Sequence, residues 1–227
     1  MKNKFLAFLS VRKYELLLVA LLLHLFNGVF MADLVFYAQV IWPINMFILG
    51  ICSVGIFSAR GSFHKLTKNI LTSLVVILPV ALIFAKASVE LMQLINIAHI
   101  AFYTFIFIEV LRYLLKPSYI SSDIVLASIC GYLLLVEIGI FTMQSMYYAN
   151  PSAFKGIDAT TNSTVFLDFV YFCSITLTSI GFGDITPSHH TTKLITAILG
   201  IAGQFYSVVL VGIMISKYTS AEINKQD

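Results

Sequence analysis

The residues best suited to a chemical task in this 227-residue chain lie at positions 178–184 and read Thr-Ser-Ile-Gly-Phe-Gly-Asp. A dehydrated cation needs a cage of oxygen atoms, and an extended backbone supplies one when successive carbonyls point toward one axis. Gly181 and Gly183 alternate with residues that carry side chains, and glycine adopts the backbone conformations that such a geometry requires. The spacing therefore predicts a cation site made of backbone carbonyls.

The apolar stretch around this motif is too short to cross a bilayer. Residues 169–183 are uncharged, and at 1.5 Å per residue they would reach only about 22 Å as a helix, against a hydrocarbon core of ~30 Å. We therefore expect the stretch to enter the membrane and return on the same side. Irregular backbone persists at that depth only where protein or a water-filled cavity surrounds it.

The composition identifies the bilayer as the solvent of the whole chain. Apolar residues make up 59% and charged residues 11%, with a formal net charge of +3 and a mean hydropathy of +0.93. A soluble domain has about 25% charged residues, and a disordered chain needs low hydrophobicity with high net charge, so both classes are excluded. The three cysteines, Cys52, Cys130 and Cys173, lie in apolar runs and indicate neither a disulfide framework nor a zinc site.

Six apolar segments are long enough to cross a bilayer as helices. They are residues 16–32, 34–59, 69–85, 91–108, 124–149 and 194–216. With the N-terminus inside, only Lys86, Lys155 and Lys193 of the 14 basic residues fall in outer segments. Cytoplasmic loops carry such an excess of Lys and Arg, so both termini are expected in the cytoplasm. The basic balance thus reports topology, not binding to nucleic acid.

Residues 166–187 resemble the pore helix, selectivity filter and outer mouth of the potassium-channel superfamily. The resemblance rests on the seven positions 178–184 and on their place between the last two of six spans, as in the single-pore, six-helix branch. It implies an all-α membrane protein with six transmembrane helices and a re-entrant pore helix and filter between helices five and six. Because the chain has one such segment, a closed filter implies a homotetrameric pore.

The resemblance also assigns the ion ligands. It implies potassium ions bound by the Ser179 hydroxyl and by the carbonyls of Ser179, Ile180, Gly181 and Phe182, in a filter that Gly183 completes. No cofactor besides these ions is implied. The pore helix, about residues 165–178, would point its negative carboxyl end toward the central cavity and favour a cation there.

Two departures from the commonest family pattern concern the filter lining. Ser179 stands where threonine is usual, which keeps the hydroxyl and removes a methyl group. Phe182 stands where tyrosine is common, and Phe172 stands where the hydrogen-bond partner of that phenol would be. An apolar pair thus replaces a polar one, and no oxygen of the cage is lost.

A third departure concerns the support behind the filter. Ile175 occupies a pore-helix position at which some relatives carry a carboxylate, so Asp184 needs another partner. Tyr171 is the candidate. The expected filter support comprises Thr178, Tyr171, Phe172 and Asp184.

The sixth span carries a candidate gate. Gly203 lies 20 residues after Gly183, where the resemblance implies a gating hinge, and glycine weakens a helix by about 1 kcal/mol relative to alanine. The alternative role is close helix packing together with Gly200 on much the same face. Helical steps from Gly203 predict a cavity-lining face that ends in an apolar inner gate and comprises Ser207, Val211 and Ile215.

The fourth span has no row of basic residues and contains only Arg112, near its inner end. Steep voltage dependence needs several charges per helix, because each contributes only about 2.3 kcal/mol per 100 mV. We therefore expect weak voltage dependence. Glu109 lies one turn before Arg112 and is expected to pair with it.

Ionisable residues inside spans are functional candidates because burying them is costly. For His24 and His99 we favour neutral side chains that are hydrogen-bonded within the helix bundle. Glu137, in the middle of the fifth span, is predicted either to hydrogen-bond a neighbouring helix or to respond to pH. His189 and His190 follow the filter, either in a solvated loop or as an external proton or metal sensor.

The predicted organisation divides the chain into five parts. They are a cytoplasmic N-terminus (1–13), a four-helix sensor-like membrane domain (14–115), a cytoplasmic linker (116–122), a pore domain (123–219) and a cytoplasmic tail (220–227).

The leading hypothesis is a passive, potassium-selective channel in the cell membrane, not an enzyme, with potassium ions, membrane lipid and further copies of the chain as partners. A proton-coupled carrier using the buried His and Glu residues is the first alternative, but it predicts paired broken helices in two halves of the chain, and only one interrupted segment occurs. An intramembrane hydrolase is the second, and neither Gly-x-Ser-x-Gly nor His-Glu-x-x-His is present.

Overall fold

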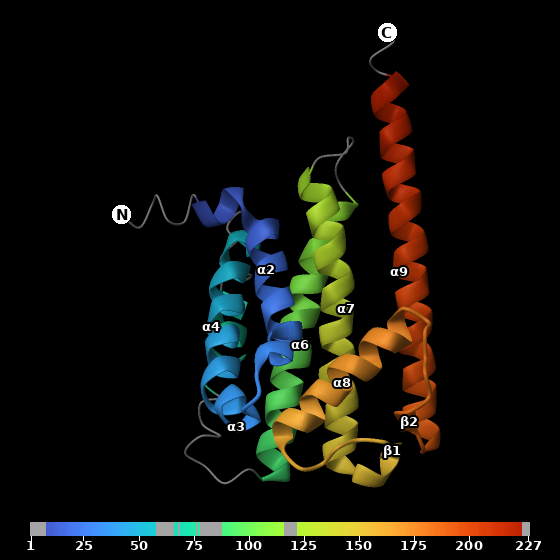
Figure 1. The fold of residues 1–227 in the computed structure, drawn as a ribbon. Helices are drawn as coiled ribbons and strands as arrows, with labels where there is room; N and C mark the ends of the chain where they lie inside the picture. Colours follow the sequence, from blue (N-terminus) through green and yellow to red (C-terminus); the bar gives the residue numbers. More distant parts are fainter. Residues whose placement is uncertain are drawn as a thin grey trace.

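The computed structural model describes residues 8–57, 66, 67, 69–75, 77, 88–115 and 122–223. Within them the chain is mostly helical, and the long helices run side by side (Figure 1). In chain order the elements are α2 (Lys13–Phe26), η1 (Asn27–Phe30), α3 (Leu34–Phe36), η2 (Tyr37–Ile41), α4 (Trp42–Ser53), η3 (Val54–Phe57), α6 (Val89–Leu114), α7 (Ser122–Ala149), η4 (Pro151–Ala153), β1 (Phe154–Lys155), α8 (Asn162–Leu177), β2 (Thr186–Pro187) and α9 (His190–Ile223).

Five helical segments of the described chain are long and apolar enough to cross a membrane. They are Lys13–Phe30, Leu34–Ser53, Val89–Leu114, Ser122–Ala149 and His190–Leu210. They overlap the first, second, fourth, fifth and sixth predicted spans, so the all-α membrane architecture is confirmed. Nine of the 17 residues of the third predicted span, 69–85, lie outside the described residues.

The second of these segments is not a regular helix. Tyr37–Ile41 form a π-helical turn, in which the N–H of Trp42 donates to the carbonyl of Tyr37. Pro43 follows at once, and a proline has no N–H and crowds the carbonyl four residues before it, here that of Gln39. The distortion expected at Pro43 thus takes the form of a widened turn.

Helix α7 lies at the centre of the fold and packs against α2, α6, α8 and α9. Small residues allow close approach in membranes, where lipid tails are as apolar as leucine and tight packing must hold helices together. An added Cβ at Gly131 would lie 2.0 Å from the hydroxyl oxygen of Tyr206, and one at Gly139 would lie 2.9 Å from Leu199. These two glycines on α7 therefore allow α9 to pack closely.

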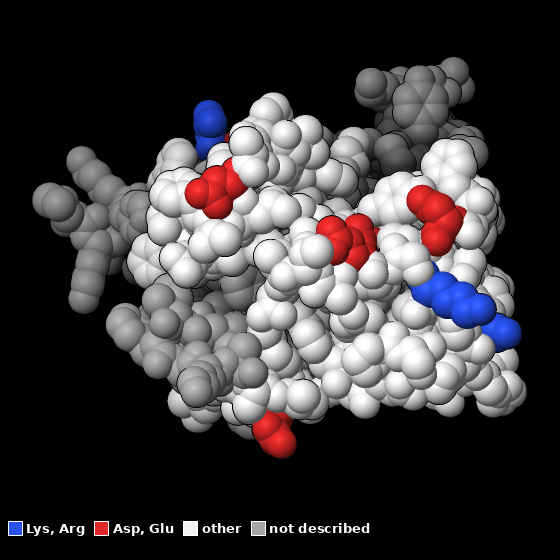
Figure 2. Space-filling view, turned by 60° about the horizontal axis from the view of Figure 1, so that its bottom comes forward, with Lys and Arg blue, Asp and Glu red and all other residues white. Residues whose placement is uncertain are grey.

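The helix α8 and the chain after it are positioned by α7 and by a two-stranded sheet. Helix α8 has 16 residues and runs obliquely from α7 toward α9 (Figure 1). A capping box between Thr161 and Thr164 fixes its first turn. Antiparallel pairing of β1 with β2 brings the chain before α8 next to the chain after residue 184. At the end of the molecule that carries these strands, a few charged side chains stand on a described surface that is otherwise uncharged (Figure 2).

Candidate functional site

The backbone of residues 178–183 alternates between two conformations. Ser179, Gly181 and Gly183 have positive φ angles of 61°, 52° and 84°, and residues with side chains stand between them. A Cβ added at Gly181 or Gly183 would meet no atom within 4 Å, so conformation rather than space favours glycine there. Ser179 is the only non-glycine with a positive φ among the described residues. Such strain collects at functional sites, and the sequence did not predict it.

Hydrogen bonds from the last turn of α8 hold the start of this segment. The carbonyl of Ile175 accepts from the N–H of Ile180 at 2.9 Å and from that of Gly181 at 3.2 Å. The Thr178 hydroxyl donates to the carbonyl of Ser174 at 2.8 Å. Ile175 thus supports the segment through its main chain, although its side chain offers no polar group.

A side chain from α9 contacts the inner end of the segment. The amide Nε2 of Gln204 donates to the Ser179 hydroxyl oxygen at 2.6 Å. Sequence reasoning missed Gln204, and the available signal was an amide in an otherwise apolar span. The contact joins α9 to the residue that the family resemblance makes the innermost ion ligand.

Gly203 packs tightly against the end of α8. A Cβ added there would lie 2.8 Å from the carbonyl oxygen of Leu177, whereas one at Gly200 would have no neighbour closer than 3.8 Å. This contact supports close packing at Gly203, and the hinge stays a prediction. The Ser207 hydroxyl donates to the carbonyl of Gly203 in its own helix. The side chains of the remaining predicted gate residues, Val211 and Ile215, lie outside what the structure describes.

The outer end of the segment carries the predicted hydrogen bond. The Tyr171 hydroxyl donates to Asp184 Oδ2 at 2.7 Å. This bond lowers the pKa of the Asp184 carboxyl and raises the pKa of the Tyr171 phenol. Phe172 instead packs against Phe154, and Phe182 is 72% exposed. Among the described ring contacts of this single chain, Phe172 and Phe182 do not meet.

The chain before α8 supports the outer end from behind. Gly156 has a φ of 85°, and an added Cβ would lie 2.2 Å from the carbonyl oxygen of Asp184. The Ser188 N–H donates to the carbonyl of Ala153 at 2.8 Å, and the Thr192 hydroxyl donates to the same carbonyl at 3.1 Å. None of these contacts was predicted, because they join segments more than 25 residues apart.

The two outer histidines lie in exposed positions after the filter segment. His189 is 3.2 Å from the Ser152 hydroxyl oxygen and 3.4 Å from Asn150 Nδ2, and His190 begins α9. No group of three or more metal-ligating side chains occurs among the described residues. A sensing role for His189 and His190 stays a prediction.

The predicted ionisable residues of the spans, His24, His99, Glu109 and Glu137, each have at least one polar partner. His24 Nδ1 lies 2.6 Å from Glu137 Oε1, and both side chains are fully buried. Glu137 therefore bonds a neighbouring helix, α2, as one of its two predicted roles required. His99 Nδ1 donates to the carbonyl of Ile95 at 2.7 Å. The expected pair between Glu109 and Arg112 is also present, at 2.5 Å.

These features define a class of protein before any relative is considered. Apolar helices that can span a bilayer surround a short helix, and the chain after that helix presents alternating backbone conformations. Residues 131–220 match the family described as "Ion channel". The chain is thus a multi-pass integral membrane protein, and residues 131–220 are similar to an ion-channel domain.

Curated relatives narrow the class. Over 61 residues the chain is 38% identical to "Two pore potassium channel a" of Oryza sativa subsp. japonica. These residues make up 27% of this chain and 16% of that protein. It is 31% identical over 100 residues to "Two-pore potassium channel 5" of Arabidopsis thaliana, 44% of this chain and 22% of that protein. The segment with the filter motif lies within the residues that match the ion-channel family, and the chain is similar to these potassium channels over part of its length.

The similarity is confined to part of each relative. The chain spans 16% to 26% of the lengths of the curated relatives it matches. No solved structure matches it significantly.

Proposed function

We propose that this chain forms a potassium-selective channel that conducts passively across the cell membrane. The observation that carries the proposal is the alternating backbone of residues 178–183, which lies within the segment that matches the ion-channel family. When every second residue is left-handed, successive peptide planes can turn their polar groups to one side of the chain. Carbonyls aligned in this way replace the hydration shell of the ion.

The ion ligands in this proposal are the hydroxyl and carbonyl of Ser179 and the carbonyls of Ile180, Gly181 and Phe182. Ile180 and Phe182 are 57% and 72% exposed in the single chain. The segment is therefore open on one side, where further copies can close the cage. A ring of four copies around one axis places four equivalent carbonyls at each level.

The sixth helix supports the same assembly. Only 6% of the residues in the apolar stretch of α9 are buried within the chain, whereas 61% of those in α7 are buried. In the proposed homotetramer α9 lines the central cavity and packs against its copies. The strand before α8, β1, pairs with the strand after the filter, β2, so the segment between them begins and ends on one side. In the proposal this is the outer side, from which α8 and the filter re-enter the membrane. Both termini lie in the cytoplasm.

Weak voltage dependence follows from the state of the fourth predicted span. Arg112 on α6 forms an ion pair with Glu109 three residues earlier on the same helix. A charge neutralised by its own helix moves little net charge across the membrane field. A proton-coupled carrier is not favoured, because His24 and Glu137 are fully buried and paired with each other.

The test of the proposal is a pair of glycine variants in liposomes. Gly181→Ala places a Cβ on a residue with a φ of 52° and should abolish potassium flux or its selectivity over sodium. Gly212→Ala is the matched control, since α9 is regular there and the added Cβ meets no atom within 4 Å. Unchanged potassium selectivity in Gly181→Ala would contradict the proposal.

A further inference from the structure

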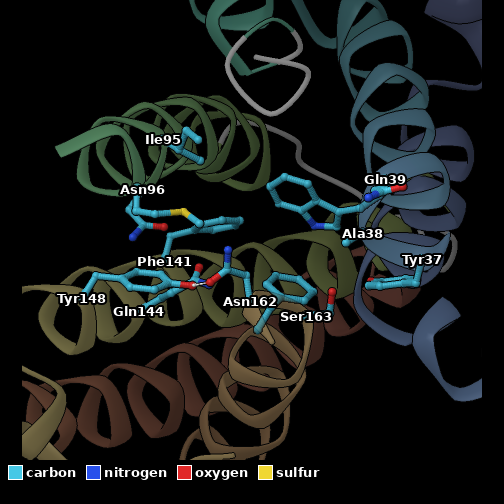
Figure 3. A pocket seen from close by; sticks show the side chains of 13 residues that line it. Tyr37, Ala38, Gln39, Ile95, Asn96, Phe141, Gln144, Tyr148, Asn162 and Ser163 are labelled. Atoms are coloured by element: carbon cyan, nitrogen blue, oxygen red, sulfur yellow. Dashed lines mark hydrogen bonds between the residues drawn. The ribbon is translucent and has the colours of Figure 1, made fainter. Parts of the chain in front are cut away.

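A cavity of about 210 Å³ lies apart from the filter segment, between η2, α4, α6, α7 and the first turns of α8. Five of its 13 lining residues are aromatic, among them Phe141 from α7 and Phe166 from α8. Figure 3 shows Asn96, Gln144 and Tyr148 gathered on one side of it and Tyr37 on the other. The cavity therefore joins the first helices of the chain to the helix that carries the filter.

Three polar groups that line this cavity have no partner within the described part of the chain. They are the Tyr37 hydroxyl, the Trp42 indole N–H and the Asn96 amide nitrogen. Tyr37 is 1% exposed and Asn96 is 2% exposed. A buried polar group left unpaired is costly, and all three of these groups can donate a hydrogen bond. The cavity thus presents donors that call for an acceptor.

The lining also limits the charge and size of an occupant. No charged side chain is among the described residues that line the cavity, so an ion would be buried without a counter-charge. An engineered apolar cavity of about 150 Å³ accommodates benzene. A volume of about 210 Å³ therefore accommodates one ring with a small polar substituent.

We propose that this cavity is a binding site for a small, uncharged ring compound that carries a carbonyl or ether oxygen. The oxygen accepts hydrogen bonds from the Tyr37 hydroxyl and the Trp42 indole N–H, and the ring lies against the aromatic side chains of the lining. At the end of α7 the Tyr148 hydroxyl donates to Asn162 Oδ1 at 3.1 Å. Binding at this site does not depend on the proposed ion conduction.

The chain contains its own reporter for the test. Trp42 is its only tryptophan, so its fluorescence monitors the cavity directly. Acetophenone, an aromatic ketone that quenches indole, is titrated into liposomes that hold the full chain. A membrane-anchored tryptophan ester in matched liposomes gives the quenching caused by ketone dissolved in the bilayer. Site binding should appear as a saturable component above that background.

One variant and one control make the test specific to the cavity. Tyr37→Phe removes a donor to the oxygen and should weaken saturable binding about threefold to tenfold. Tyr132→Phe removes a hydroxyl on α7 outside the cavity and should leave binding unchanged. Anisole should displace acetophenone about tenfold better than ethylbenzene, which has no acceptor, at equal concentrations in the bilayer.

The contrary result is quenching of Trp42 that rises linearly with acetophenone concentration, with the same slope as quenching of the anchored ester. That result would show that the cavity holds only water and would overturn the proposal. Equal affinity in wild type and Tyr37→Phe would overturn it as well. Tyr37→Phe removes a single oxygen atom and is therefore expected to leave the fold intact.

Discussion

The buried pair of His24 and Glu137 predicts a large effect of a single substitution on stability. Both side chains are fully buried, and 2.6 Å separates Nδ1 from Oε1. Replacing His24 by Leu leaves Glu137 without its partner, and breaking a buried pair in this way costs about 3–5 kcal/mol. In a domain of 150–250 residues each kcal/mol shifts Tm by about 2–4 °C, so we expect a fall of roughly 6–20 °C.

The ion pair of Glu109 and Arg112 is the control within the same chain. The Arg112 side chain is 49% exposed, and partly exposed pairs contribute only about 0–1 kcal/mol. Arg112→Gln should therefore lower Tm by no more than about 4 °C. The double variant His24→Leu with Glu137→Leu should recover most of the lost stability, because two apolar side chains replace a buried polar pair at little net cost.

The assay is thermal unfolding of the detergent-solubilised protein, followed by circular dichroism at constant detergent concentration. A fall in Tm for His24→Leu as small as that for Arg112→Gln would refute the reasoning. The reasoning would also be refuted if the double variant lost more stability than the two single variants lose together, because the coupling between the residues would then have the wrong sign.

Three further predictions concern conduction. Gln204→Leu removes the bond to the Ser179 hydroxyl, at a cost of about 1 kcal/mol per subunit, and should speed the loss of current when potassium is lowered in a bilayer recording. Tyr171→Phe should also speed current decay at neutral pH. The bond from Tyr171 lowers the pKa of Asp184, so its stabilisation is present at neutral pH and is lost as the pH falls through that lowered pKa; the variant should lack this acid sensitivity. Open probability should change little with voltage, because the fourth span carries no unpaired row of basic residues. A conductance that rises steeply with voltage would contradict this prediction.

The parts of the site that the sequence predicted are those with local causes. Positive φ at Gly181 and Gly183 follows from residue type and spacing. The bond from Tyr171 to Asp184 joins residues 13 positions apart on either side of the filter motif. The pair of Glu109 and Arg112 is one helical turn long. Residue type accounts for the glycine conformations, and the helix fixes the distance between Glu109 and Arg112. The bond from Tyr171 to Asp184 was indicated by the family resemblance together with the missing carboxylate at Ile175.

The parts that the sequence could not predict depend on how distant segments pack. The contact of Gln204 with Ser179 requires the angle between α8 and α9, which periodicity does not encode. The approach of Gly156 to Asp184 depends on the pairing of β1 with β2. A partner for Glu137 on a neighbouring helix was expected. The sequence could not identify it as His24, because the two residues are 113 positions apart. Hydropathy gives the spans, and only packing gives their neighbours.

Potassium selectivity is tested most directly by the reversal potential of the purified chain in liposomes or planar bilayers, with potassium on one side and sodium on the other. The account predicts a reversal potential that follows the potassium gradient at about 59 mV per tenfold change at 25 °C. It also predicts that exchanging sodium for an impermeant cation has no effect. A reversal potential near zero with equal potassium and sodium on opposite sides would contradict a carbonyl filter selective for potassium.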